Sequence, residues 1–360
     1  MVLLLFPLAS CDLGYYWQAA RGQMEILRLR RPIDEVLADP EVPEPTKAKL
    51  RLILDVQTFG VEKMSLPDEG RYTTYADLQR DQATWLVVAA DPFQIKAVEH
   101  CYWIVGCLEY KGYFTREDAD ALAAELEAEG KDVLVRPVMA YSTLGWFDDP
   151  VLNTFLRSDE FGLTGTILHE QAHRVLFVKG DTAFNEGFAE FVEQEGVARF
   201  LGASGENGRE RLQRYRDQQA DDARFHALLV RGKARLEAVY AAGRAAGMPD
   251  AELRLEKARA FDALRQDYEN ARDSFIVLNY EGWFSRPLNN AHLVSVRQYQ
   301  SRVAAFAGLF AESGGDFHQF LEAARGLAEL DKPERDQRLD ALELKAPSAA
   351  SARMPVHERS

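Results

Sequence analysis

The spacing of apolar residues along the chain predicts mostly helices, with a small group of strands in the first half. Helical spacing covers residues 15–57, with breaks at prolines. The β-branched run 83–92 predicts a buried strand and 101–114 a second extended segment, while 133–141 predicts a strand after a helix that ends at Gly130. A few strands among many helices indicate the α+β class, dominated by helix.

Helical patterns fill most of the second half. A helix around TILHEQAH is followed closely by a second helix, which Asp181 or Thr182 would cap. The heavily charged stretch 207–273, broken at 241–250, predicts a long helical hairpin. Residues 279–293 read as a loop rich in aromatic and amide groups, and two helices are expected to follow it, up to about residue 345. The small, polar tail 346–360 is expected to be disordered.

Length, composition and charge narrow the class of protein. The 360 residues are 47% hydrophobic, which is typical of a globular protein with a substantial core. We predict one domain over residues 12–345, with the helical hairpin inside it. A net charge of −14 argues against a nucleic-acid partner and against membrane binding by charge alone. No apolar run approaches the length of a transmembrane helix.

The N-terminal sequence contains a candidate lipidation site. Leu8-Ala9-Ser10-Cys11 matches the bacterial lipobox, in which the signal is cut before the cysteine and the cysteine is acylated. Residues 1–11 are therefore read as a truncated or atypical lipoprotein signal, since no basic residue precedes the apolar run. The alternative is an ordinary buried strand. Lipidation predicts an exported protein on the periplasmic side of a membrane, held by Cys11 rather than by a transmembrane helix.

The remaining two cysteines, Cys101 and Cys107, form an even pair. Export would place them in an oxidising compartment, where disulfides persist. Their separation of six residues permits a disulfide, and two free thiols are equally compatible with it.

The strongest chemical signal is His169-Glu170-Gln171-Ala172-His173, an H-E-x-x-H pattern. On a helix, residues at i and i+4 project from one face, so both imidazoles can converge on one metal ion. Glu170 points elsewhere and can reach a metal-bound water rather than the metal. The alternative is two partly buried, hydrogen-bonded histidines on an ordinary helix. The apolar face of this helix and the acidic helix that follows favour the metal site.

The following helix supplies several carboxylates. Glu186, Glu190 and Glu193 occur at i, i+4 and i+7, on or near one face, while Phe188 and Phe191 mark the core side. Acidic runs on helices are usually solvated, so this spacing alone assigns no ligand.

The segment NEGFAEFVEQEG resembles the second metal-binding helix of zinc aminopeptidases of the gluzincin type. More widely, about residues 11–330 resemble a bacterial family of predicted aminopeptidases, many of them lipoproteins. The resemblance is carried by GYYWQAARGQMEIL, TTYADLQRDQATWLVVAA, YKGYF, AYSTLGWFDDPVL, LHEQAH, GDTAFNEGFAEFVE and LNNAHL. Two features depart from the well-studied enzymes: charged Arg174 follows the motif, and the spacing between His173 and Glu186 is shorter.

The resemblance implies a zinc peptidase with a peptide substrate. One Zn²⁺ per chain would be held by His169, His173 and Glu186, with Glu170 as the general base. Glu190, one turn after Glu186, is expected to accept the spare N–H of a ligating histidine. The competing assignment makes Glu190 the ligand itself.

Further residues are assigned by analogy with this class. Tyr280 is the first choice for the donor to the tetrahedral oxyanion, with Tyr141 and Tyr299 as competitors. The segment from Tyr141 to Gly145 lies where related peptidases pair an edge strand with the substrate backbone. His292 is expected either to contact substrate or to order its own loop. The resulting prediction is a zinc aminopeptidase; the alternatives are an endopeptidase of the same mechanism and a catalytically silent, metal-stabilised lipoprotein scaffold.

Overall fold

The computed structural model describes residues 13–68, 72–102, 106–139, 150–203, 205, 207–296 and 302–346. Contacts divide the chain into two compact units. Unit 1 comprises Met1–Asp39, Arg71–Arg157 and Asp217–Arg297, and unit 2 comprises Pro40–Gly70, Ser158–Arg216 and Gln298–Ser360. Helices predominate and the sheets are small, so the predicted α+β class is confirmed.

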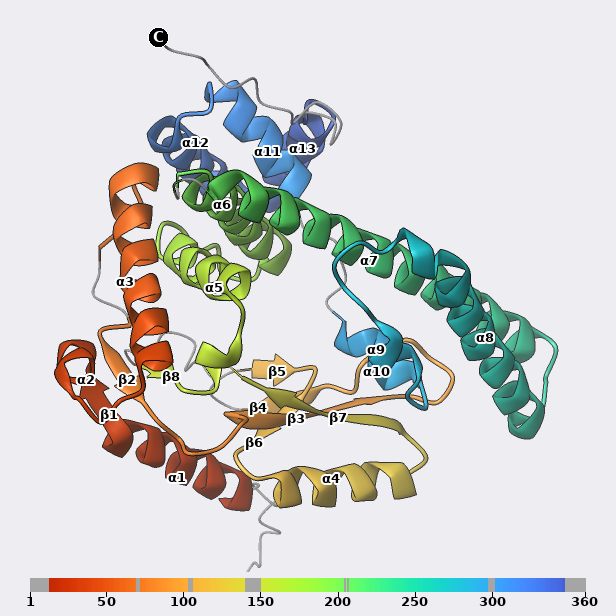
Figure 1. Cartoon of the computed structure of the whole chain (residues 1–360). Coiled ribbons are helices and arrows are strands. Elements are labelled where there is room, and N and C mark those ends of the chain that lie inside the picture. Colours follow the sequence, from red (N-terminus) through yellow and green to blue (C-terminus); the bar gives the residue numbers. More distant parts are fainter. Residues whose placement is uncertain are drawn as a thin grey trace, which may run out of the picture. The chain divides into compact units, whose positions relative to one another are not determined.

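Unit 1 contains an antiparallel three-stranded sheet in the order β6–β3–β7. Its strands are β6 (Lys111–Tyr113), β3 (Thr84–Ala90) and β7 (Asp132–Val138). Val87 and Ala89, two residues apart on β3, are buried together with Ala119 and Ala123 of helix α4 (Arg116–Ala128). Period-2 alternation along β3 thus gives the sheet one face that α4 covers, and Figure 1 shows the helix below the strands.

The other strands of unit 1 are short. A second sheet has the order β1–β2–β8, from Arg30–Pro32, Thr74–Ala76 and Val151–Leu152. A two-stranded ribbon joins β4 (His100–Tyr102) to β5 (Gly106–Leu108). The segment 101–114 was predicted to be extended, and its described residues do form strands, but three short strands rather than one.

The helices at the N-terminal end of the described chain are α1 (Leu13–Leu29) and α2 (Ile33–Ala38), and a 3₁₀ turn η1 spans Phe155–Arg157. Gln18 of α1 donates through Nε2 to the carbonyl of Gly112 and accepts through Oε1 from the N–H of Phe114. These two bonds attach α1 to strand β6 and the residue that follows it.

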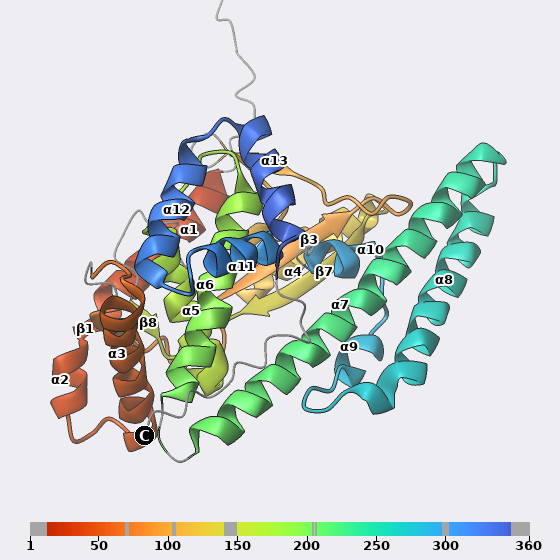
Figure 2. The ribbon, with the colours of Figure 1, turned by 90° about the horizontal axis from the view of Figure 1, so that it is seen from above.

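The predicted charged hairpin is confirmed. Helices α7 (Gly208–Ala245) and α8 (Asp250–Ala271) run side by side (Figure 2). Arg235 of α7 pairs with Asp267 of α8 at 2.9 Å. An aromatic and aliphatic cluster that includes Phe225, Phe261 and Tyr268 is buried here, so the hairpin has an apolar side beneath its charged surface.

The loop predicted for residues 279–293 is wrong in part. After a 3₁₀ turn, η2 (Arg272–Ser274), two short helices lie in this stretch: α9 (Glu281–Phe284) and α10 (Asn290–Ser295). Asn289 caps α10 through the N–H of His292. Asn290 donates through Nδ2 to the carbonyls of Asp91, Pro92 and Gln94. These tertiary bonds stabilise a helix too short for hydrophobic periodicity to reveal.

Unit 2 is helical. Its helices are α3 (Glu44–Met64), α5 (Glu160–His173), α6 (Thr182–Gly202), α11 (Val303–Glu312), α12 (Phe317–Glu329) and α13 (Lys332–Glu343). Phe188 of α6 stacks on Phe320 of α12 and meets Phe306 of α11 edge to face, so aromatic rings fill the core. Three helices, rather than the predicted two, follow residue 302, because Asp316 and Asp331 each cap a new helix.

Candidate metal centre

Helix α5 carries both histidines of the H-E-x-x-H pattern. Asp159 caps the helix by accepting a hydrogen bond from the N–H of Gly162, and α5 ends at His173. Ile167, Leu168 and Ala172 are fully buried, whereas the side chains of His169 and His173 stay 14% and 23% exposed. The apolar periodicity of α5 therefore directs both imidazoles toward the edge of the core, where solvent can reach them.

Only eight residues separate α5 from α6, and two side-chain contacts fix this short connection. Asn185 accepts from the N–H of Val178 and donates to its carbonyl, both at 2.8 Å. Asp181 caps α6 through the N–H of Phe184 and is paired with Arg335 of α13. The residue immediately before Glu186 thus holds the connection, and this explains how so short a linker can still bring Glu186 opposite α5.

The pair of Asp181 and Arg335 is buried, since each side chain is only 4% exposed. Oδ2 of Asp181 accepts from Nε and Nη2 of Arg335 at 3.1 and 2.8 Å. Burial alone would raise the pKa of Asp181, but the hydrogen bonds from Arg335 and Phe184 and the nearby positive charge outweigh it, so the pKa is lowered. The carboxylate is therefore held ionised at the start of α6.

His169, His173 and Glu186 converge. Their Nε2, Nε2 and carboxylate oxygen atoms all lie within 4.8 Å of one another. The two Nε2 atoms are 3.1 Å apart, and each lies 3.6 Å from an oxygen of Glu186. A tetrahedral zinc site with bonds of about 2.1 Å has ligand atoms about 3.4 Å apart. The three observed distances bracket that value, although the two histidines lie nearest to different oxygens of Glu186, and the three donor groups are compatible with a tetrahedral metal ion.

The outer nitrogen of His169 contacts Glu193. Nδ1 of His169 lies 2.9 Å from Oε2 of Glu193, two turns after Glu186 on α6. The carboxylate of Glu190, which was expected to accept from a ligating histidine, instead accepts from Nε2 of Gln194 at 3.2 Å. The structure therefore gives the contact to Glu193 rather than Glu190. The only sequence signal for Glu193 was its place on the same helical face.

The carboxylates control the protonation of His169. Burial by itself would lower its pKa, but hydrogen bonds and charge from Glu186 and Glu193 raise the pKa to about 9. The same negative potential that stabilises an imidazolium favours a metal cation between these groups. Glu193, bonded through Nδ1, leaves Nε2 of His169 directed at His173 and Glu186.

Two glycines give the site its close packing. A Cβ at Gly165, one turn before His169, would lie 2.7 Å from Oε1 of Glu193. A Cβ at Gly187, next to Glu186, would lie 2.6 Å from the backbone nitrogen of Arg302. The glycine of N-E-G is thus required because the chain at Arg302 passes directly against α6.

Comparison with known proteins identifies one family. A family model described as "putative aminopeptidase" matches residues 14–339. The chain belongs to this family. The match includes His169, Glu170, His173 and Glu186, and it confirms at family level the resemblance found in the sequence. No curated protein and no solved structure matches the chain.

Tyr280, the predicted oxyanion donor, belongs to unit 1, whereas the candidate metal ligands His169, His173 and Glu186 belong to unit 2. Its hydroxyl donates to the carboxylate of Asp222 at 2.5 Å, and its ring stacks on Phe225 with centroids 4.1 Å apart. Burial and the neighbouring carboxylate both raise the pKa of Tyr280. The oxyanion role stays a prediction.

His292 lies in unit 1 and is 5% exposed. It takes part in a capping box with Asn289 at the start of α10, and burial lowers its pKa to about 4. This contact corresponds to the expectation that His292 orders its own loop. Tyr141, Gly145, Tyr299 and Cys11 lie outside the described residues.

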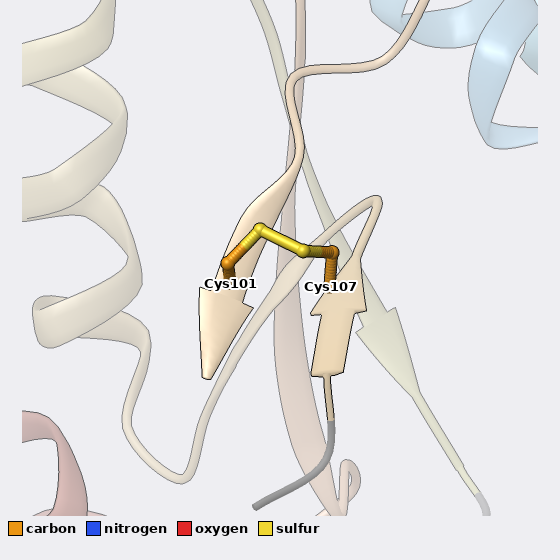
Figure 3. The surroundings of a disulfide bond; sticks show 2 residues. All are labelled: Cys101 and Cys107. Atoms are coloured by element: carbon orange, nitrogen blue, oxygen red, sulfur yellow. A yellow bond between two sulfur atoms is a disulfide. The ribbon is translucent and has the colours of Figure 1, made fainter. Parts of the chain in front are cut away.

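Cys101 and Cys107 form a disulfide, which settles the alternative that the sequence left open. They are directly opposite each other in the register of β4 and β5, and Figure 3 shows the bond joining the two strands. Their sulfurs and a carboxylate oxygen of Glu99 lie close enough to hold a metal ion. Because the sulfurs are joined to each other, they offer no thiolate.

Within the described part of the chain, no helix combines the length and the apolar character needed to cross a membrane.

Proposed function

We propose that this chain is a zinc-dependent aminopeptidase that hydrolyses peptide bonds with a metal-activated water and a glutamate general base. The observation that carries the proposal is the convergence of His169, His173 and Glu186 from two helices. Membership of the aminopeptidase family supports the reaction class. Two imidazoles and one carboxylate are one of the donor sets of catalytic zinc sites, which leave a fourth position for water.

Each residue has a separate role in the proposed mechanism. His169, His173 and Glu186 would hold one zinc ion, which when bound would acidify a water molecule and polarise the scissile carbonyl. Glu170, partly exposed between the two histidines, would take the proton of the attacking water and deliver it to the departing amine. Glu193 would hold the ring of His169 in the orientation that directs Nε2 inward.

The proposed location is the periplasmic side of a bacterial membrane, with the chain anchored by a lipid on Cys11. The disulfide between Cys101 and Cys107 supports an oxidising compartment, because such bonds are rare in reducing cytosol. In the native-length gene, Cys11→Ser should abolish incorporation of labelled palmitate. Unchanged incorporation in that variant would contradict the lipid anchor without touching the proposed peptidase.

The test of the mechanism separates the general base from the metal ligand. Glu170→Gln should keep one zinc per chain and lose about 10²–10⁴-fold in rate, because a base affects proton transfer and not metal affinity. Glu186→Gln should lose zinc and activity together. Glu190→Gln is the matched control, since Glu190 lies one turn away on α6 and its carboxylate bonds to Gln194 rather than to a histidine.

Zinc content and the rate on a panel of chromogenic aminoacyl substrates are to be measured on all variants under one condition. If Glu190→Gln loses its zinc and Glu186→Gln keeps it, Glu190 is the metal ligand and Glu186 is not. Full activity of Glu170→Gln would remove the proposed base.

The same purified protein distinguishes two alternative functions, an endopeptidase and a catalytically silent scaffold. Cleavage of peptides whose N-terminus is acetylated would identify an endopeptidase, because an aminopeptidase must bind the free α-ammonium group. Stoichiometric zinc without cleavage of any peptide would identify the silent scaffold.

A further inference from the structure

One face of helix α1 packs against the rest of unit 1. Gln18 bonds to the backbone of Gly112 and Phe114, and a Cβ at Gly22 would overlap the ring of Phe114. Ile26 is 1% exposed. Residues 18, 22 and 26 recur every four positions, so they define the inner face of the helix.

The opposite face of α1 is unusual for a soluble surface. Trp17 is 73% exposed and Met24 is 48% exposed, and Arg21 and Arg28 are exposed beside them. At about 100° per residue these four positions fall within an arc of about 60°, over a length of about 16 Å. We call this set the α1 strip. It combines a large aromatic ring, a flexible apolar chain and two positive charges on one line.

The charge of the α1 strip is opposite to that of the whole chain. The chain carries −14, yet the strip contains no carboxylate. The adjacent acid, Glu25, is already paired with Arg80 at 2.8 Å. Among the described residues, no ion pair forms to Arg21 or Arg28. The two guanidinium groups are thus available to an anionic partner.

We propose that the α1 strip lies along an anionic lipid surface, with Trp17 and Met24 among the headgroups and acyl boundary and Arg21 and Arg28 on lipid phosphates. Tryptophan with its apolar body and polar N–H, and arginine with its apolar stem, are suited to this boundary. This inference goes beyond the proposed peptidase activity and does not depend on it, but it draws part of its support from the proposed acylation of Cys11.

Two features favour a lipid surface over a second copy of the chain. In a two-fold dimer built on this face, the arginine line would meet itself, so like charges would be juxtaposed. In addition, the strip offers only two large apolar side chains, whereas stable protein interfaces bury about 800 Å² on each partner. The sequence position agrees with the lipid surface, because Trp17 follows the proposed acylation site at Cys11 by only six residues.

The experiment measures binding of the full, unacylated chain to vesicles. The chain carrying Cys11→Ser is sedimented with vesicles of phosphatidylglycerol and phosphatidylethanolamine, and with vesicles of neutral phosphatidylcholine alone. Binding should be detected on the anionic vesicles and should weaken as salt is raised. Since each basic residue near an anionic surface contributes about fivefold, Arg21→Gln with Arg28→Gln should weaken binding about 25-fold.

The apolar part is tested by Trp17→Ala with Met24→Ala, which should weaken binding at least tenfold on the same vesicles. The matched control is Val230→Ala with Leu255→Ala, which removes two apolar side chains that are 63% and 61% exposed on α7 and α8. The control should bind like the parent. Circular dichroism should show that both double variants keep the parent fold, because all four side chains face solvent.

Three results would overturn the proposal. The parent could fail to bind anionic vesicles, or it could bind them with the same affinity after the α1 strip is altered. Alternatively, sedimentation equilibrium could show a dimer that the α1 variants dissociate, which would assign the strip to a second copy of the chain.

Discussion

Gly165→Ala tests whether the space beside His169 exists for the carboxylate of Glu193. The new Cβ would lie 2.7 Å from Oε1 and 3.2 Å from Cδ of Glu193. Because a carboxylate is the end of a flexible side chain, Glu193 can turn away while the helices stay in place. His169 would then lose the 2.9 Å contact at Nδ1.

Gly165→Ala should affect the free energy of unfolding and the metal affinity differently. Alanine in a helix interior is favoured over glycine by about 1 kcal/mol, so the fold should be retained. Loss of the carboxylate behind a ligating histidine typically weakens metal binding by about 10–100-fold, which corresponds to about 1.4–2.7 kcal/mol. Gly165→Ala should therefore leave the free energy of unfolding of the metal-free chain near that of the parent and weaken zinc binding.

The assay is zinc competition with a chromophoric chelator, together with urea unfolding of the metal-free chain. Gly326→Ala is the matched control, since Gly326 also lies inside a helix of unit 2 but a Cβ there meets nothing within 4 Å. It should bind zinc like the parent. In a Glu193→Ala background, Gly165→Ala should have no further effect on zinc affinity, because the contact it disturbs is already absent.

Unchanged zinc affinity in Gly165→Ala would refute the reasoning. So would an equal loss of affinity with and without Glu193, because the effect would then arise from a shift of the helix itself.

Three other predictions concern the framework of the site and the disulfide. Asp181→Asn should destabilise the fold by about 3–5 kcal/mol in urea, because it leaves Arg335 buried without its charge partner. Since folding lowers the pKa of Asp181, the pair stabilises the parent above the unfolded pKa of about 3.9, and this stabilisation is lost as pH falls through the lower folded value. In urea titrations from pH 7 to 3, the free energy of unfolding should fall less for Asp181→Asn than for the parent. An identical fall would exclude the pair as its source. Gly187→Ala should lower the free energy of unfolding by about 1–3 kcal/mol and also weaken zinc binding, because its Cβ meets the backbone of Arg302, which cannot move away as a side chain could. A thermal unfolding curve like that of the parent would contradict this. Replacing Cys101 and Cys107 by serine should lower the free energy of unfolding by about 2 kcal/mol, because the disulfide closes a short loop in unit 1. Zinc affinity should stay unchanged, and a change would show coupling that the contacts do not predict.

The sequence alone determined the features that depend on local spacing. Two histidines four residues apart must share a helical face, so His169 and His173 could be paired before any tertiary contact was known. The α7–α8 hairpin was equally local, because its helical periodicity is long and its break is marked by glycines and a proline. The cap of α6 could be narrowed to Asp181 or Thr182 because a cap bonds to a backbone N–H a few residues on, and the structure gives Asp181.

Tertiary structure decided which carboxylates meet those histidines. Glu186, Glu190 and Glu193 share one region of α6, and the sequence analysis assigned Glu190 to the spare N–H of a ligating histidine. The crossing of α5 and α6, with Gly165 at the contact, brings Glu193 there instead. Helix α10 likewise depends on distant carbonyl groups that Asn290 contacts. Such contacts join residues far apart in the chain, and their geometry is fixed by packing, which periodicity along a single segment does not encode.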